Sequence, residues 1–137
     1  DYARRTDAPD ELRSEAIFWI GQMRGETSSA FLRELFPTLQ TNELRERVLF
    51  SVAQRRNPED AQWLVERAKD TRLSIETRKQ ALFWAGQAGV GVADLAAIYD
   101  NARTDRELRE AVIFSLSQRR NNREAIDKLI SIVRTEQ

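Results

Sequence analysis

A twelve-residue motif occurs four times along this chain, and this repetition restricts the possible folds more than any single residue does. The four copies are ELRSEAIFWIGQ (11–22), ELRERVLFSVAQ (43–54), ETRKQALFWAGQ (76–87) and ELREAVIFSLSQ (107–118). They recur every 31 to 33 residues. A period of this size is typical of repeat arrays, in which each unit buries its apolar face by stacking on its neighbours. Such a chain is expected to work through an extended surface.

Each copy of the motif predicts the first helix, A, of a helix pair. A projection at 100° per residue places the second, sixth, ninth and tenth motif residues on one face, which we expect to be the core stripe. In the first repeat this stripe is Leu12, Ala16, Trp19 and Ile20, and in the last it is Leu108, Val112, Ser115 and Leu116.

A second helix, B, is predicted after each A helix, over roughly 28–40, 58–70, 92–102 and 122–135. Asn57 has the features of an N-cap, because Pro58 takes the first helical position and two acidic residues follow. Pro37 is expected to kink the first B helix or end it early. The apolar sets include Phe31, Leu32, Leu35 and Phe36 in the first B helix, and Ile126, Leu129, Ile130 and Val133 in the last.

Odd and even repeats differ at two motif positions. The ninth residue is Trp19 or Trp84 in the odd repeats and serine in the even ones, and the odd repeats carry glycine before the final glutamine. The double unit spans 64 or 65 residues. If the repeats stack in order, large and small side chains alternate at one interface, as a close-packed core requires.

The motif resembles the first helix of HEAT repeats, since [LT]-R-x-x-[AV] is followed by an apolar residue and then a small one. It is most similar to the short HEAT-like repeats of the phycobilisome lyase type, and the resemblance covers nearly the whole chain. It implies an all-α, right-handed α-solenoid of four two-helix repeats, with about eight helices, A helices outside and B helices lining the concave side. The repeats would span approximately 10–41, 42–72, 73–104 and 105–137 of a single domain, 1–137. It also implies a protein-binding scaffold.

The third motif residue is the arginine of the family. The resemblance implies that it braces neighbouring repeats by pairing with loop acids and carbonyl groups. The residues at this position are Arg13, Arg45, Arg78 and Arg109.

The eighth and twelfth motif residues depart from the family, whose repeats usually carry variable polar residues there. In the projection they lie together, nearly opposite the core stripe, beside the leading glutamate. An exposed apolar row usually marks an interaction site, whereas packing between adjacent A helices would bury the rings. Both interpretations stay open here, and solvent exposure of the rings decides between them. The eight residues are Phe18, Phe50, Phe83 and Phe114 with Gln22, Gln54, Gln87 and Gln118.

Residues 1–8 resemble the stretch that leads into the fourth A helix. They are expected to be the tail of a preceding B helix, which would make the chain part of a longer array, or else a capping extension. The longest wholly apolar run, 16–20, is too short to cross a bilayer.

Composition removes several classes of function. The chain has no cysteine and no histidine, which excludes thiol nucleophiles, disulfides, and thiolate or imidazole metal sites. The run 86–91 follows a helix and lacks a Gly-Lys-Ser/Thr sequence, so it predicts a turn and not a nucleotide loop. We therefore expect a non-enzymatic chain without a cofactor or a metal.

Basic and acidic residues balance at 22 each, which disfavours nucleic acid as a partner because phosphate contacts dominate such affinity. The pairs Arg55-Arg56 and Arg119-Arg120 complement helix dipoles, or else form a phosphate-binding edge at the turns. The expected function is a protein-interaction scaffold, with partners along the concave B helices or against the Phe/Gln positions. The alternatives are a nucleic-acid-binding solenoid, similar to HEAT-like DNA glycosylases and using arginine-rich turns, and a structural spacer.

Overall fold

The computed structural model describes residues 9–23, 25–55, 57–103, 105–119 and 121–135, so the proposed preceding-repeat tail at 1–8 lies outside them. Over these ranges the chain forms eight α-helices, one short 3-10 helix and no strand, which confirms the all-α fold. The A helices are α1 (Asp10–Gln22), α3 (Asn42–Ala53), α5 (Ile75–Gln87) and α7 (Arg106–Ser117). The B helices are α2 (Glu26–Leu35), α4 (Pro58–Lys69), α6 (Val92–Ala102) and α8 (Arg123–Thr135). None of the described helices has the length and apolar character needed to span a bilayer.

Local sequence signals set the ends of these helices. The Asn57 side chain accepts a hydrogen bond from the Glu59 N–H (2.8 Å), so the predicted N-cap of α4 is confirmed. Helix α2 ends before Pro37, which lies in the 3-10 helix η1 (Phe36–Thr38), so the early end is confirmed as well. Side chains also cap α3, α5 and α7, from Thr41, Ser74 and Asp105.

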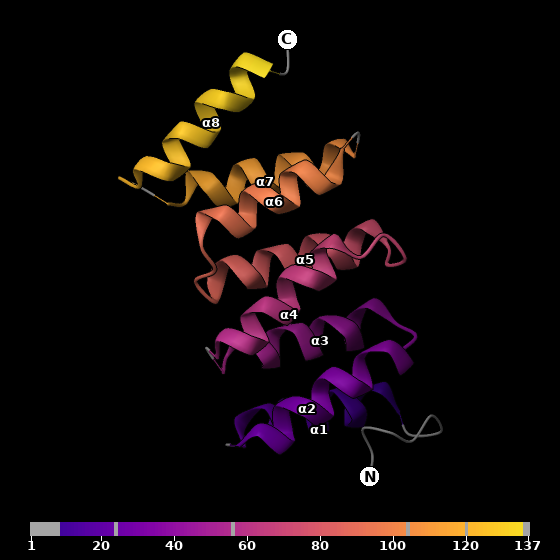
Figure 1. The fold of residues 1–137 in the computed structure, drawn as a ribbon. Helices are drawn as coiled ribbons and strands as arrows, with labels where there is room; N and C mark the ends of the chain where they lie inside the picture. Colours follow the sequence, from indigo (N-terminus) through magenta and orange to yellow (C-terminus); the bar gives the residue numbers. More distant parts are fainter. Residues whose placement is uncertain (1–8, 24, 56, 104, 120, 136–137) are drawn as a thin grey trace.

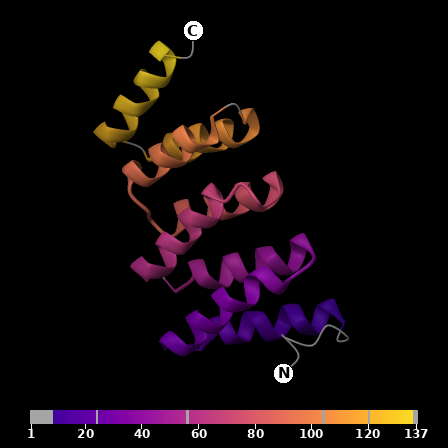
Figure 2. The same ribbon diagram turned by 45° about the vertical axis from the view of Figure 1, so that its right-hand side comes forward.

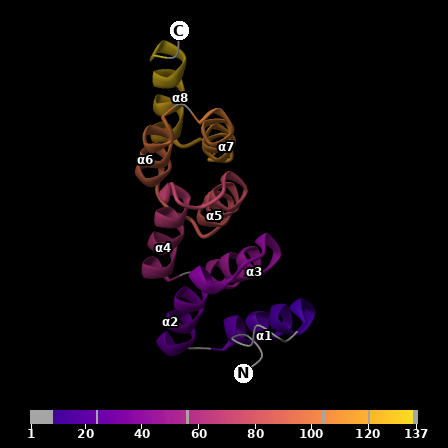
Figure 3. The same cartoon turned by 90° about the vertical axis from the view of Figure 1, so that its right-hand side faces the viewer.

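The helix pairs stack in chain order (Figures 1 and 2). Viewed from the side, the A helices form one layer and the B helices the other (Figure 3). Each A helix contacts the next A helix, and each B helix from α4 onward contacts the next B helix. The seventh motif residues Ile17, Leu49 and Leu82 are buried together with apolar side chains of the B layer, including Leu64 and Leu95. The contacts are those of a helical repeat.

Two kinds of junction alternate along the A layer. From an odd to an even repeat, glycine faces serine: a Cβ built on Gly21 would lie 2.6 Å from the Ser51 Cβ. From the even second repeat to the odd third, Trp84 of α5 packs edge-on against Phe50 of α3, with ring centroids 5.0 Å apart. We call these the odd-to-even and even-to-odd junctions. Large and small residues therefore alternate between junctions.

The predicted core stripe of the first repeat is wrong for two of its four residues, while Ala16 and Ile20 do pack against the core. Leu12 is 44% exposed and Trp19 is 56% exposed, whereas the equivalent residues Leu44 and Ser51 of α3 are buried. The ninth motif position faces the preceding A helix, as the contact of Trp84 shows. Among the described helices, α1 contacts only one A helix, α3, so this side of α1 has no cover.

The predicted apolar set of the last B helix is also mostly outside the core. Ile126, Ile130 and Val133 are 49%, 44% and 69% exposed, and Leu129 is half-buried. Helix α8 runs steeply away from α6 and α7 (Figures 1 and 2), and no described helix follows it. The amphipathic pattern of α8 is present, but its apolar face lacks a partner within the described ranges.

An ion pair between Asp70 and Arg72 lies in the turn after α4. The Arg72 side chain donates two hydrogen bonds to the Asp70 carboxylate, both of 3.0 Å, and these bonds lower the pKa of Asp70 below its ordinary value. Because the pKa of Asp70 is lower in the folded chain, its interaction with Arg72 stabilises the fold above the pKa that Asp70 has in the unfolded chain. This stabilisation is lost as the pH falls through the pKa of Asp70 in the folded chain. NMR titration should show the Asp70 pKa rising toward the ordinary value in Arg72→Ala. An unchanged pKa would contradict the assignment.

Candidate interaction surface

The eight residues at the eighth and twelfth motif positions lie on the A helices or directly after them. We call them the Phe/Gln surface, and they are Phe18, Phe50, Phe83, Phe114, Gln22, Gln54, Gln87 and Gln118. All four glutamines are exposed. Phe83 and Phe114 are 45% and 58% exposed, and Phe18 and Phe50 are half-buried. The rings are thus not fully buried, and their exposure is greatest on α5 and α7.

Neighbouring aromatic and cationic groups explain why the rings differ. The Phe18 ring packs edge-on against Trp19 at 5.2 Å and lies 5.8 Å from the Arg47 guanidinium. Phe50 is covered by Trp84, which also contacts Phe83 edge-on at 4.9 Å. Edge-to-face pairs of this kind are favourable beyond the area they bury. The tryptophans of the odd repeats therefore shield part of the phenylalanine row.

Hollows separate successive A helices along this surface. The hollow between α1 and α3, of about 700 Å³, combines aromatic rings with acidic side chains, and its lining includes Phe18, Trp19, Glu11, Glu15 and Glu43. A smaller hollow of about 150 Å³ lies between α5 and α7. Its lining includes Phe83, Gln87, Phe114, Gln118 and Arg119. Each hollow offers an apolar contact beside hydrogen-bonding groups, which is the composition of a site for a protein side chain.

The leading glutamates of the motif give the surface a second row. All four are exposed, and they are Glu11, Glu43, Glu76 and Glu107. Glu107 pairs with Lys79 of the preceding A helix at 3.5 Å. The outer side of each A helix thus carries a carboxylate near its start, a phenylalanine in its middle and a glutamine near its end.

Three of the motif arginines, Arg45, Arg78 and Arg109, contact the preceding B segment. Arg45 donates to the Leu39 carbonyl from Nε and Nη2, at 3.1 and 2.8 Å. Arg78 is buried and donates from Nε to the Ala68 carbonyl at 2.9 Å. The Arg109 guanidinium lies 4.4 Å from the centroid of the Tyr99 ring, and Arg13 is buried. The contacts of Arg45, Arg78 and Arg109 join the second, third and fourth repeats to the repeat before each of them.

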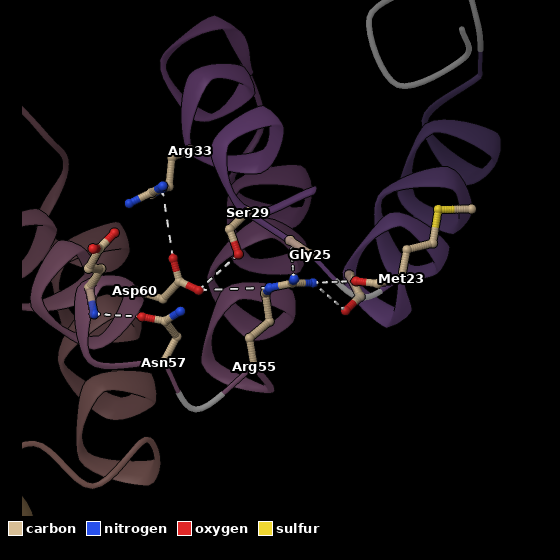
Figure 4. Close-up of polar contacts among 9 residues, drawn as sticks. Met23, Gly25, Ser29, Arg33, Arg55, Asn57 and Asp60 are labelled. Atoms are coloured by element: carbon tan, nitrogen blue, oxygen red, sulfur yellow. Dashed lines mark hydrogen bonds and ion pairs between the residues drawn. The ribbon is translucent and has the colours of Figure 1, made fainter. Parts of the chain in front are cut away.

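One polar cluster was not found from the sequence. Asp60, in the first turn of α4, is 1% exposed and accepts a 3.0 Å hydrogen bond from the Ser29 hydroxyl of α2. Arg33 and Arg55 each bring Nε to 3.8 Å from one of its carboxylate oxygens (Figure 4). We call these four residues the Asp60 cluster. Acidic residues favour helix starts in general, so nothing in the sequence distinguished Asp60 from its exposed neighbour Glu59.

Arg55 also holds the turn that follows α1. It donates to the carbonyl groups of Gly21 (3.2 Å), Met23 (2.6 Å) and Gly25 (2.5 Å). These bonds leave it poorly placed to contact phosphate, and its neighbour Arg56, like Arg24 and Arg120, lies outside the described residues. The proposed arginine edge therefore rests on few described side chains.

The described residues of the two central B helices, α4 and α6, expose no basic side chain. The exposed residues of these two helices are neutral or acidic, and they are Pro58, Glu59, Gln62 and Glu66 in α4 and Ala93, Ala97, Asp100 and Asn101 in α6. A polyanion would gain no counterion release from these side chains.

Comparison of the chain with protein-family models, with curated proteins and with solved structures finds no match. The surface described above is therefore the basis for the functional proposal.

Proposed function

We propose that this chain is a non-enzymatic protein-binding scaffold, built as a right-handed HEAT-like α-solenoid, that binds its partner through the Phe/Gln surface. The observation that carries the proposal is the exposure of Phe83 and Phe114 on adjacent A helices, around a hollow that Gln87 and Gln118 also line. Exposed aromatic rings beside hydrogen-bonding side chains are typical of binding hot spots.

The partner that fits is a segment of another protein that presents apolar side chains. An amphipathic helix or an extended segment could place its side chains in the hollows between the A helices. The exposed glutamates at the first motif position favour basic residues on the same segment. The central B helices α4 and α6 are a weaker candidate, because they expose no large apolar side chain.

Selection of peptides from a displayed library against the immobilised chain provides a ligand for the test. Phe83→Ala should then weaken binding of a selected peptide by about 30-fold, as expected for loss of a hot-spot residue worth about 2 kcal/mol. Gln87→Ala should weaken it by a smaller factor. Isothermal titration calorimetry measures both constants, and circular dichroism confirms that the variants are folded.

Gln62→Ala is the matched control, since Gln62 is an exposed helical glutamine on the opposite layer. It should leave the dissociation constant unchanged. The proposal fails if Gln62→Ala weakens binding while Phe83→Ala does not, since the partner would then lie on the B layer. Salt-dependent binding of a DNA oligonucleotide, unaffected by Phe83→Ala, would support the nucleic-acid alternative instead.

A further inference from the structure

Exposed large apolar side chains gather at the two ends of the stack. Among the described residues, Leu12, Trp19 and Met23 lie on α1 or directly after it. Phe114 lies on α7, and Ile126, Ile130 and Val133 lie on α8. Phe83 is the only member of this exposed set away from the ends. We call the two groups the α1 end and the α7/α8 end; they close the stack at opposite sides (Figure 2).

At the α7/α8 end, α8 carries apolar side chains at two positions that are buried in α4 and α6, each of which contacts the following A helix. The eighth and eleventh residues of α4 are Val65 and Ala68, which are 1% and 0% exposed. The same positions of α6, Tyr99 and Ala102, are also buried. In both pairs the following A helix, α5 or α7, contacts this B helix. In α8 the equivalent residues Ile130 and Val133 are 44% and 69% exposed.

The α1 end matches the other side of such a junction. Trp84 contacts its own repeat's Phe83 at 4.9 Å and 80°, and the preceding repeat's Phe50 at 5.0 Å and 75°. Trp19 contacts its own Phe18 in the same way, at 5.2 Å and 79°, yet is 56% exposed. Its ring already has the arrangement of Trp84, and within the described residues no phenylalanine of another repeat packs against it.

Phe114 is the equivalent of Phe50, because both are the eighth motif residue of an even repeat, and Phe114 is 58% exposed. The fourth repeat is even and the first is odd. If the fourth repeat of one copy contacted the first repeat of another, Trp19 could therefore pack on Phe114 as Trp84 packs on Phe50 at the even-to-odd junction.

We propose that copies of this chain associate head to tail, with α1 of one copy seated against α7 and α8 of the next and Trp19 packed on Phe114. This interface uses different surfaces on the two copies, so it extends into open chains unless the rotation closes a ring. The proposed interface shares Phe114 with the Phe/Gln surface, so a bound partner and a second copy would compete for that ring. Phe83 belongs to the Phe/Gln surface alone, because it lies away from both ends of the stack.

Sedimentation velocity of the whole chain over a range of concentrations tests the association. The expected result is a mass that rises above the 15.9 kDa of one copy as the concentration increases. Trp19→Glu places a charge on the α1 end and Val133→Glu places one on the α7/α8 end. Each variant alone should stay at the mass of one copy, and circular dichroism should show unchanged folding because both residues are exposed.

A mixture of the two variants separates this interface from a symmetric one. Trp19→Glu keeps an intact α7/α8 end and Val133→Glu keeps an intact α1 end, so the mixture should form one-to-one pairs that grow no further. Phe83→Ala is the control and should associate like the unchanged chain, even where it abolishes peptide binding. A chain that stays single up to about 1 mM, or a mixture that forms no pairs, would overturn the proposal.

Discussion

Asp60→Ala should lower the free energy of unfolding by about 3 kcal/mol, the largest effect that we expect from a single polar substitution here. The carboxylate is 1% exposed, and its removal leaves the Ser29 hydroxyl without its acceptor and two arginines without their counter-charge. The cost is large because the buried Ser29 hydroxyl stays desolvated without an acceptor, and because the Arg55 side chain, 12% exposed, meets little water that could replace the carboxylate. Chemical denaturation measures the loss.

Glu59→Ala is the matched control, since Glu59 occupies the same first turn of α4 but is exposed. It should change stability by no more than about 0.5 kcal/mol. Asp60→Asn keeps an acceptor for Ser29 and loses the charge, so its cost should lie between the two. Equal effects of Asp60→Ala and Glu59→Ala would show that the cluster does not stabilise the fold.

The position of the cluster also predicts where the structure loosens. Asp60 joins α4 to α2. Arg55, between α3 and α4, donates to carbonyl groups in the last turn of α1 and directly after it. Stability in repeat proteins is approximately a sum of repeat and interface terms. Hydrogen exchange in Asp60→Ala should therefore accelerate most in α1 and α2, and least in α6 and α7.

Local signals in the sequence were sufficient to predict the helices. The fourfold motif predicted the four A helices, and Asn57, Pro58 and Pro37 predicted where B helices begin or end. Each of these signals acts within a few residues along the chain. The structure reproduces them because capping and proline geometry depend little on tertiary contacts.

Burial was harder to predict, because it depends on neighbours that a single helix does not specify. The projection placed Trp19 in the core, yet the same motif position is exposed on α1 and half-buried on α5, where Phe50 covers it. The projection also omitted Ile17, which is fully buried. Each described A helix packs on at least one B helix, α5 on α4 of the preceding repeat, and also on another A helix. The buried sector is therefore wider than the stripe of one amphipathic face.

The sequence indicated which residues form the candidate site, but not how strongly each of the phenylalanine side chains is exposed. Repetition identified the phenylalanine and glutamine positions, and the glutamines are exposed in all four repeats. The difference between Phe50 and Phe114 arises from Trp84, which lies in the following repeat. Asp60 could not be identified in advance, since its partners lie up to 31 residues away in the sequence.

The odd-to-even junctions give the second large effect. Gly21→Ala should destabilise the chain by about 2 kcal/mol, because the added Cβ would lie 2.6 Å from the Ser51 Cβ and 3.0 Å from its Oγ. Ser51 is 1% exposed and belongs to the helix α3, so relief requires a shift between α1 and α3. Urea denaturation of the variant measures the cost.

Gly86→Ala is the matched control at the same motif position of the third repeat. Its Cβ would meet only the Ser115 Oγ at 3.8 Å, which is an ordinary contact. Because alanine favours a helix over glycine by about 1 kcal/mol, this variant should be neutral or slightly more stable. Adding Ser51→Gly to Gly21→Ala removes the opposing Cβ and should recover the part of the loss due to overpacking. If the two alanine variants responded equally, helix propensity and not the closer approach of α1 to α3 would determine the effect.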